Sequence, residues 1–321
     1  MTQALEQPDP SARGGEPSNQ GDQSHPLGAW LVFGSAFVWS LGGIIARLAE
    51  VENPWTTIFW RSGTAALFLL AFMLLRDGRA GTIQLFARMG AAGLAVAACF
   101  TIASTSFVVA LQHTTVANVL LMQAGVPLIA ALISRVLFGE RLRPSTALAI
   151  AAVIAGVAVM VSDSLTGKVS PIGDGLSLLI ALSFASATVI TRRKAGIRMT
   201  PAVCTATAMG CALALALSLA TAGSVAVEAW QLPVLGLFGI SLGLGLALFT
   251  QGARLIPSAF AALLGTAEPI LGPLWVWFFL GEVPSPRTVV GGAIVLAAIL
   301  AYFALQLAQH RRGRRLAAPV H

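Results

Sequence analysis

Charged side chains are scarce in this chain. Only 10% of its 321 residues are Asp, Glu, Lys or Arg, whereas 56% are apolar. A soluble domain carries about 25% charged residues, and so apolar a core could not be covered by the polar residues that remain. The composition therefore predicts an integral membrane protein. The net charge of +7 is then expected to sit in loops that hold the topology, and no nucleic acid partner is expected.

Residues and motifs that would mark several other classes of protein are also missing. The three cysteines, Cys99, Cys204 and Cys211, lie inside apolar runs, which favours unpaired packing residues over a disulfide or a metal site. The apolar runs hold no histidine, no H-E-x-x-H motif and no paired aspartates, so an intramembrane enzyme is disfavoured and no cofactor is expected. A primary pump is excluded because the chain has no G-x-x-x-x-G-K-[ST] phosphate loop. A channel is disfavoured because no rings of like groups are evident.

What the sequence does contain is ten apolar segments, each close to the roughly 20 residues that a helix needs to cross a bilayer. Because the bilayer interior offers backbone groups no partner, helix is expected for all of them. The predicted fold class is all-α integral membrane, with ten transmembrane helices at 27–48, 54–76, 86–110, 115–137, 144–163, 172–192, 200–222, 231–253, 257–280 and 286–308.

The two ends of the chain differ from this apolar body. Residues 1–26 are rich in Pro, Gly, Ser and Gln, which predicts a disordered cytoplasmic tail. They lack the pattern of a cleaved signal peptide, so the first helix is expected to be retained. Residues 309–321 are predicted to form a basic cytoplasmic tail.

Basic residues orient the chain. With a cytoplasmic N-terminus, 16 of the 20 Lys and Arg residues fall in inner segments and 4 in outer ones, namely Arg47, Arg61, Lys168 and Arg287. Because basic residues accumulate on the cytoplasmic side, both termini are expected inside, in the cell inner (plasma) membrane.

Two stretches, 117–155 and 259–297, repeat each other at an offset of 142 positions, with 11 identities in 39 aligned residues. The offset superposes Pro127 on Pro269, Gly139-Glu140 on Gly281-Glu282, and Pro144 on Pro286. A second match, at an offset of 145, pairs Pro26-Leu27-Gly28 with Pro171-Ile172-Gly173, and Arg47 with Arg192.

These matches define two five-helix repeats, 27–163 and 172–308. Because five is an odd number, the second repeat enters the membrane from the opposite face. Two inverted repeats around a midplane site are the architecture of alternating-access transporters.

Short motifs in both repeats carry a resemblance to a known family: Ala36–Gly42 (AFVWSLG), Arg61, Val126-Pro127, Phe138–Leu142 (FGERL), Glu268-Pro269 and Leu280–Glu282 (LGE). With these motifs the chain resembles an EamA-type drug/metabolite transporter over 27–308. The resemblance implies two tandem EamA repeats and export of amino acids, metabolites or drugs, and one branch of the family exports aromatic amino acids. The second repeat departs from the pattern at Val283-Pro284, where a basic residue is absent. We interpret this change as topological, because that loop is predicted outside.

A transported polar solute needs polar or aromatic groups at midplane depth that face a cavity. The candidate substrate-binding residues are Ser35, Trp39 and Gly42 in helix one, Thr101, Ser104 and Phe107 in helix three, Asn118 and Met122 in helix four, Ser183 and Ser186 in helix six, and Glu268 in helix nine. For Ser, Thr and Gly the alternative is close helix packing. Trp39 is alternatively a buried aromatic, and Asn118 a helix cap or a snorkelling side chain.

Two charges lie within predicted spans. Glu268, whose repeat partner is Val126, is interpreted either as a site for a substrate ammonium or a proton, or as a structural carboxyl at the kink of Pro269. The family pattern favours the structural interpretation. Arg61 either binds a substrate carboxylate or snorkels to the outer interface, and snorkelling is favoured.

The predicted function is secondary transport: export of small metabolites, amino acids first and aromatic ones included, by alternating access around a midplane cavity. A multidrug or other metabolite exporter of the same fold is the alternative. The expected partners are a small-molecule substrate and the lipid bilayer. The GxxxG spacing of Gly239 and Gly243 suits either close packing between helices or a dimer face. The resemblance implies a monomer, which favours packing within the chain.

Overall fold

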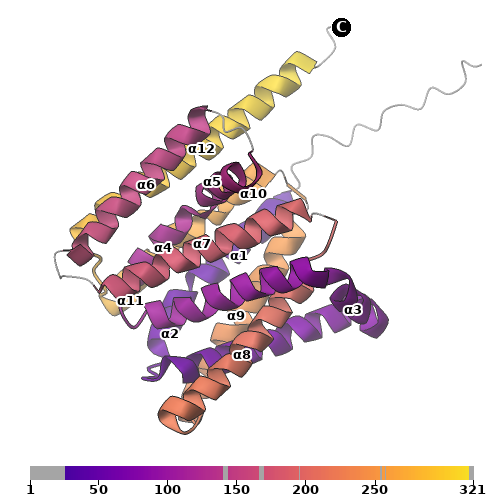
Figure 1. Cartoon of the computed structure of the whole chain (residues 1–321), viewed down its shortest axis with the longest axis vertical. Coiled ribbons are helices and arrows are strands. Elements are labelled where there is room, and N and C mark those ends of the chain that lie inside the picture. Colours follow the sequence, from indigo (N-terminus) through magenta and orange to yellow (C-terminus); the bar gives the residue numbers. More distant parts are fainter. Residues whose placement is uncertain are drawn as a thin grey trace, which may run out of the picture.

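The structure is a computed structural model that describes residues 26–139, 144–165, 170–194, 196–253, 255–256 and 258–317. Every regular element within these residues is an α-helix (Figure 1). The predicted tail at 1–26 lies outside the described residues apart from Pro26, as does Glu140 of the first Gly-Glu pair. The last helix continues into the predicted basic tail.

The helices follow one another in the order α1 (Pro26–Ser40), α2 (Gly42–Leu48), α3 (Pro54–Ala110), α4 (Val116–Ala124), α5 (Val126–Phe138), α6 (Pro144–Leu165), α7 (Pro171–Arg193), α8 (Thr200–Ala222), α9 (Gln231–Gly252), α10 (Ser258–Gly265), α11 (Ala267–Leu280) and α12 (Pro286–Ala317). Proline stands first in several of them, where its missing N–H would have no helical partner in any case.

The long element α3 is a hairpin of two helices. Its 57 residues would measure about 85 Å if straight, far more than a bilayer requires. The backbone leaves helical geometry at Gly78 (φ 69°) and Gly90 (φ 54°), conformations that only glycine adopts without strain. Arg61 and Ser104 lie 43 positions apart, yet the Arg61 Nη1 atom is 3.2 Å from the Ser104 hydroxyl. The two arms of α3 therefore lie side by side and antiparallel.

When α3 is counted as two helices, the number of spans agrees with the predicted ten. Eight helices of the described chain are long and apolar enough to cross a membrane, and the bent pair α4 and α5 makes a ninth span. The second arm of α3 makes the tenth.

The repeat is visible in how the helices break and end. Span four bends by 45° between α4 and α5, at Gly125. Span nine breaks between α10 and α11 at Thr266, which the offset of 142 places one residue from Gly125. Both spans end on a left-handed glycine, Gly139 (φ 67°, ψ 17°) and Gly281 (φ 66°, ψ 16°). The glycine of each Gly-Glu pair noted in the sequence thus ends its helix in the left-handed conformation.

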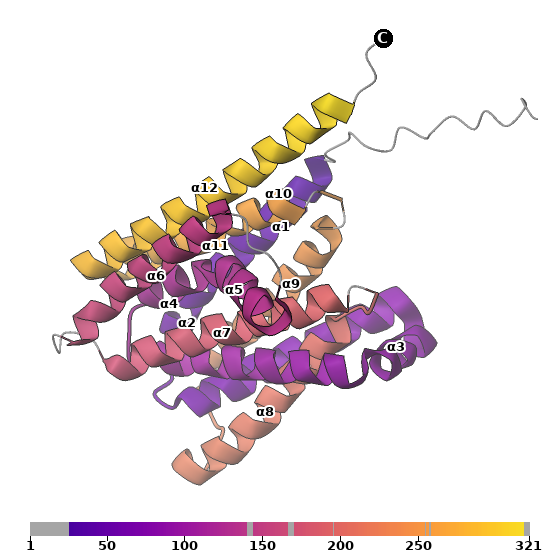
Figure 2. The ribbon, with the colours of Figure 1, turned by 45° about the horizontal axis from the view of Figure 1, so that its top comes forward.

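The helices pack in two groups. In one, α6 and α12 lie along each other and enclose Leu128, Val153 and Val295 together with α4 and α5. In the other, the α3 hairpin packs against α7, α8 and α9, and α9 also lies along α1 (Figure 2). The three cysteines are free thiols. Cys204 packs against Leu69 and Met73, and its Sγ donates to the carbonyl oxygen of Ala66 at 3.7 Å.

The connections expected outside the membrane gather at one end of the bundle. One pocket is lined by Arg47, in the last turn of α2 before the first of these connections, and by Thr114, Ser170 and Ser285 from three others. The fifth joins them through Gln231, whose Nε2 donates to the carbonyl oxygen of Ala49 at 3.0 Å.

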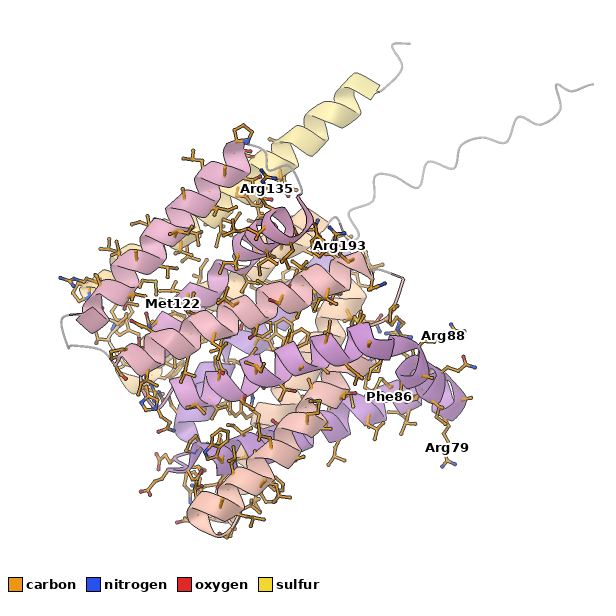
Figure 3. All side chains as sticks on the ribbon, viewed as in Figure 1. Arg79, Phe86, Arg88, Met122, Arg135 and Arg193 are labelled. Atoms are coloured by element: carbon orange, nitrogen blue, oxygen red, sulfur yellow. The ribbon has the colours of Figure 1, made fainter. Side chains whose placement is uncertain are left out.

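The connections expected inside gather at the other end. The Arg198 Nη1 atom lies 2.8 Å from Asp77 Oδ1, which ties the connection after α7 to the α3 hairpin. The Arg193 guanidinium lies 3.4 Å from the ring centroid of Phe138. Figure 3 shows Arg79, Arg88, Arg135 and Arg193 at this end of the molecule. These arginines therefore lie at the end of the bundle that the sequence analysis expected on the cytoplasmic side.

Candidate functional site

The face of α1 expected to line a cavity carries the contact with α9. The Trp39 Nε1 atom donates to the carbonyl oxygen of Leu242 at 3.3 Å, and its indole crosses Gly245, where a Cβ atom would overlap it. Trp39 remains half-buried, and its ring lies 5.9 Å from that of Phe249. Gly42, the first residue of α2, faces the ring of Phe238, which also belongs to α9.

Most of the candidate hydroxyl groups bond to backbone. Ser35 donates to the carbonyl oxygen of Val32, Ser186 donates to that of Leu182, and both bonds lie within one helix. Thr101 donates both to its own helix and, at 3.1 Å, to Ala206 of α8. Ser183 is buried and the structure gives its hydroxyl no hydrogen bond. Such bonds are the usual means by which a hydroxyl is accommodated in an apolar bundle.

The two candidates of span four point to different neighbours. Asn118 Nδ2 donates to Asp174 Oδ1 at 2.5 Å and to Thr114 Oγ1 at 3.0 Å, while the Asn118 Oδ1 atom is buried without a hydrogen bond. Met122 is 1% exposed and packs against Met160 of α6. Asp174, which sequence analysis did not select, thus joins Asn118 in linking spans four and six.

Glu268 lies in the first turn of α11, directly after the break in span nine. It is half-buried, and no hydrogen bond or ion pair holds its carboxylate among the described residues. A structural carboxyl at a proline kink would be expected to accept a hydrogen bond from the frame around it. The geometry therefore leaves this carboxylate available to another group.

Arg61 does not snorkel. The residue is 7% exposed, and its guanidinium carbon lies 4.4 Å from the centroid of the Phe238 ring and 5.5 Å from that of Phe107. Its Nη1 atom donates to both the carbonyl oxygen and the hydroxyl of Ser104. Three candidate residues from the sequence therefore lie beside Arg61 or Phe238: Ser104 and Phe107 contact Arg61, and Gly42 faces Phe238.

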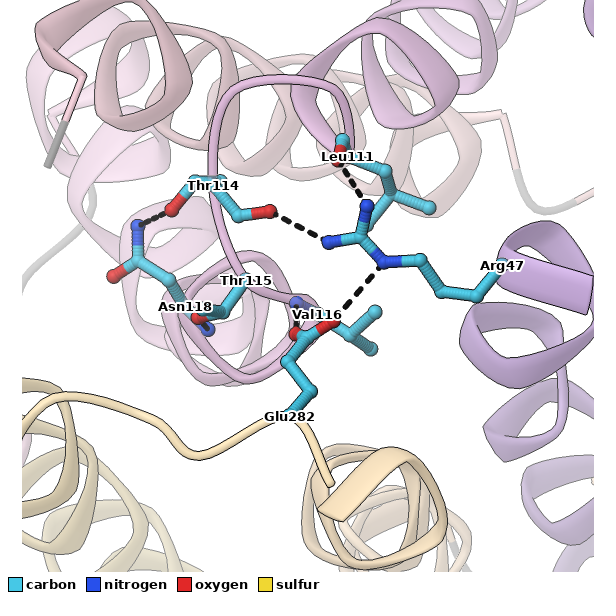
Figure 4. A network of polar contacts seen from close by, with 7 residues as sticks. All are labelled: Arg47, Leu111, Thr114, Thr115, Val116, Asn118 and Glu282. Atoms are coloured by element: carbon cyan, nitrogen blue, oxygen red, sulfur yellow. Dashed lines mark hydrogen bonds and ion pairs between the residues drawn. The ribbon is translucent and has the colours of Figure 1, made fainter. Parts of the chain in front are cut away.

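At the end of the bundle that is expected to face outward, called the outer end below, a charged network joins the two repeats (Figure 4). Arg47 Nε lies 3.0 Å from Glu282 Oε2, and the other two nitrogens of Arg47 donate to the carbonyl oxygens of Leu111 and Thr114. Glu282 Oε1 accepts the backbone N–H of Val116, at the start of α4. A carboxylate is stabilised there by the free N–H groups of the helix.

The pocket beside this network has a volume of about 330 Å³ and is lined mainly by hydroxyl, amide and imidazole groups. Sequence analysis marked both Arg47 and Glu282 as members of the repeat but did not predict that they pair. The repeat does not suggest the pairing, because Arg47 corresponds to Arg192 and Glu282 to Glu140.

One serine stands in a pattern that elsewhere marks a nucleophile. Residues 239–243 read G-x-S-x-G, which in hydrolases forms a sharp turn between a strand and a helix. Here the segment is the interior of α9, and the Ser241 hydroxyl donates to the carbonyl oxygen of Phe238 at 2.8 Å. The local structure is therefore not a nucleophile elbow.

An apolar bundle of ten spans, broken symmetrically in spans four and nine and with unpaired charges at span depth, defines a multi-pass membrane transporter of small molecules. The EamA-like transporter family matches the chain twice, over residues 26–162 and 171–304, and the chain belongs to that family.

One curated protein is a relative of this chain, and one solved structure shares its fold. The uncharacterized transporter YwfM of Bacillus subtilis (strain 168) is 27% identical over 288 residues, which cover 83% of this chain and 90% of that protein. A solved crystal structure shares the fold with a TM-score of 0.63 and 19% identity, over 87% of this chain and 98% of its own.

Proposed function

We propose that this transporter exports amino acids, aromatic ones among them, by alternating access between its two inverted repeats in the cell inner membrane. Glu268 is the residue that carries the proposal. A carboxylate within a span costs about 2.5–3.5 kcal/mol on insertion scales, so a group that compensates for it is expected. The part of the chain that the structure describes supplies no such group, and the ammonium group of a bound amino acid would.

The break in span nine supports this role for Glu268. The carboxylate sits at the junction of α10 and α11, and interrupted helices are where transporters of inverted-repeat architecture hold polar solutes. Phe37 and Trp275 meet edge to face with ring centroids 5.9 Å apart, and Trp275 Nε1 donates to the Ser40 hydroxyl. Aromatic groups therefore join α1 to α11 about two turns beyond Glu268. Aromatic surface of this kind suits an aromatic side chain.

The test is uptake by the purified protein in proteoliposomes, with a panel of radiolabelled amino acids and of cationic drugs, with and without a proton gradient. Saturable uptake of an amino acid, absent from empty liposomes, is the expected result. Uptake of drugs with no uptake of any amino acid would overturn the substrate class and favour a multidrug exporter.

A further inference from the structure

The second intramembrane charge, Arg61, is enclosed by protein and lacks a counter-ion. It is 7% exposed, and no described carboxylate lies within ion-pair distance of it. The rings of Phe107 and Phe238 and the Ser104 side chain surround its guanidinium. Cation–π contacts compensate in part for the lost hydration of an arginine, but they use the faces of the guanidinium plane and leave its N–H groups unpaired.

The hydrogen bonds of Arg61 are confined to one corner of the guanidinium. Nη1 donates to the carbonyl oxygen and the hydroxyl of Ser104, each at 3.2 Å. Nε is buried and has no hydrogen-bond partner, and no hydrogen bond of Nη2 is found. Nε and Nη2 form one edge of the fork, and a buried charged donor left without an acceptor is costly. This edge matches the two oxygens of a carboxylate, which arginine binds through two parallel N–H···O bonds.

We propose that the Nε–Nη2 edge of Arg61 is a binding site for the carboxylate group of the transported solute, with Phe107 and Phe238 flanking the apolar part of that solute. The inference rests on the proposed function, because it assigns the acidic end of an amino acid to a second residue. A planar monoanion fits better than a phosphate dianion, since the surroundings supply one positive charge and otherwise apolar walls.

A binding measurement tests the site without relying on transport. The full chain in lipid nanodiscs is titrated with phenylacetate and, separately, with phenylacetamide, and binding is followed by isothermal titration calorimetry and by thermal stabilisation. The amide has nearly the shape of the acid but carries no charge and only one carbonyl acceptor. Phenylacetate is expected to bind at least about tenfold more tightly than the amide, as for other hydrogen bonds to charged groups.

Two variants and a control locate the effect. Arg61→Gln should abolish the preference for the acid. Arg61→Lys should reduce it to about threefold, because lysine keeps the charge but lacks the fork. Arg76→Gln is the matched control: Arg76 lies in the same arm of α3 and also contacts a ring, that of Phe72 at 5.9 Å, but it is exposed. It should leave the preference unchanged.

The results separate the two proposals. An equal affinity of the wild type for acid and amide overturns the Arg61 site, even if Arg61→Gln does not fold. Preference for the acid that persists in Arg61→Gln overturns it as well. Tight binding of the acid through Arg61, with no amino acid transported, would retain the site and overturn only the amino acid assignment. Amino acid transport undisturbed in Arg61→Gln would retain the proposed function and overturn the site.

Discussion

Single residues show how differently this membrane protein accommodates polar groups. Hydroxyl groups such as that of Thr105 donate back to their own helix and need nothing further. The two charges within spans have no such local solution. Arg61 is held between aromatic rings with one edge unpaired, and Glu268 has no partner in the described chain. Polar groups that the fold leaves incomplete are the best candidates for contact with a transported solute.

The first prediction concerns Glu268. Glutamine keeps the volume and most of the hydrogen bonding of glutamate but cannot ionise. Since no hydrogen bond of the frame depends on Glu268, we expect Glu268→Gln to keep the wild-type Tm within about 2 °C. We expect its transport rate at limiting substrate to fall at least about tenfold, because a charged hydrogen bond to substrate is lost.

Glu268→Ala supplies the comparison. Normal transport by Glu268→Gln, together with a large loss of Tm in Glu268→Ala, would show that the carboxyl is structural, as the family pattern favoured. Proteoliposome uptake and thermal unfolding in detergent measure the two quantities.

The second prediction concerns Trp39, which packs across Gly245 and donates to Leu242. Trp39→Ala should lower the stability by on the order of 2 kcal/mol, less than the 3–5 kcal/mol of a fully buried aromatic because Trp39 is only half-buried. Trp30→Ala, at a residue of α1 that is 71% exposed, is the control and should leave Tm nearly unchanged. Loss of transport by Trp39→Ala with an unchanged Tm would instead place the indole in the substrate path.

At the scale of helices, small residues determine how closely elements approach. Glycines of α9 meet two neighbouring helices: Gly252 and Gly245 lie against α1, the latter at Trp39, and Gly239 lies against the backbone of α3. Gly239 and Gly243, whose spacing was noted in the sequence, thus make contacts within the chain, with Thr64 and Phe68. Close contact without side chains between helices is the usual basis of association in membranes.

The third prediction compares two glycines of α9. A Cβ atom at Gly239 would overlap the carbonyl oxygen of Arg61, which cannot move without moving the helix, whereas at Gly236 no atom lies within 4 Å. Gly239→Ala should therefore lower stability by about 1–3 kcal/mol, the range of overpacked cores. Gly236→Ala should be neutral or raise stability by up to about 1 kcal/mol, since alanine is the better helix former. Equal Tm values for both variants would contradict the close contact of α9 with α3.

Helices and repeats were largely predictable, because both depend on local sequence. The apolar segments located all ten spans, and the offset of 142 anticipated the matching left-handed ends at Gly139 and Gly281. The neighbours of each face were not predictable. Periodicity placed Trp39 and Gly42 on one face of helix one, but only the folded structure shows that α9 occupies that face.

The pairing of charges was unpredictable for a related reason. Arg47 and Glu282 are separated by 235 positions, and no local feature of either segment identifies the other as its partner. Arg61 was expected to snorkel, because its depth in the span alone allowed it. Burial by Phe107 and Phe238, the latter from another repeat, decides otherwise.

Across the whole molecule, the two ends of the bundle are held by different interactions. The outer end closes through Arg47 and Glu282, which join span one, the start of span four and the end of span nine. The inner end joins the α3 hairpin to the connection after α7 through Asp77 and Arg198. Each of these ion pairs joins one repeat to the other. If the repeats move relative to each other, the ion pair at one end would have to break while the ion pair at the other end stays formed. Alternating access requires this exchange.

The last prediction concerns the orientation of this bundle and the hairpin of α3. Each arm of α3 is flanked by exposed residues, Glu52 and Arg79 around the first and Arg88 and His113 around the second. With both termini cytoplasmic, a membrane-impermeant maleimide added to intact spheroplasts should label Glu52→Cys and His113→Cys. Arg79→Cys and Arg88→Cys should be labelled only after permeabilisation, because basic residues mark the inner side. The four variants are made in a background without the free thiols of Cys99, Cys204 and Cys211. The reversed pattern would keep the ten spans and invert the orientation, whereas labelling of Glu52→Cys and Arg79→Cys from the same side would contradict the hairpin itself.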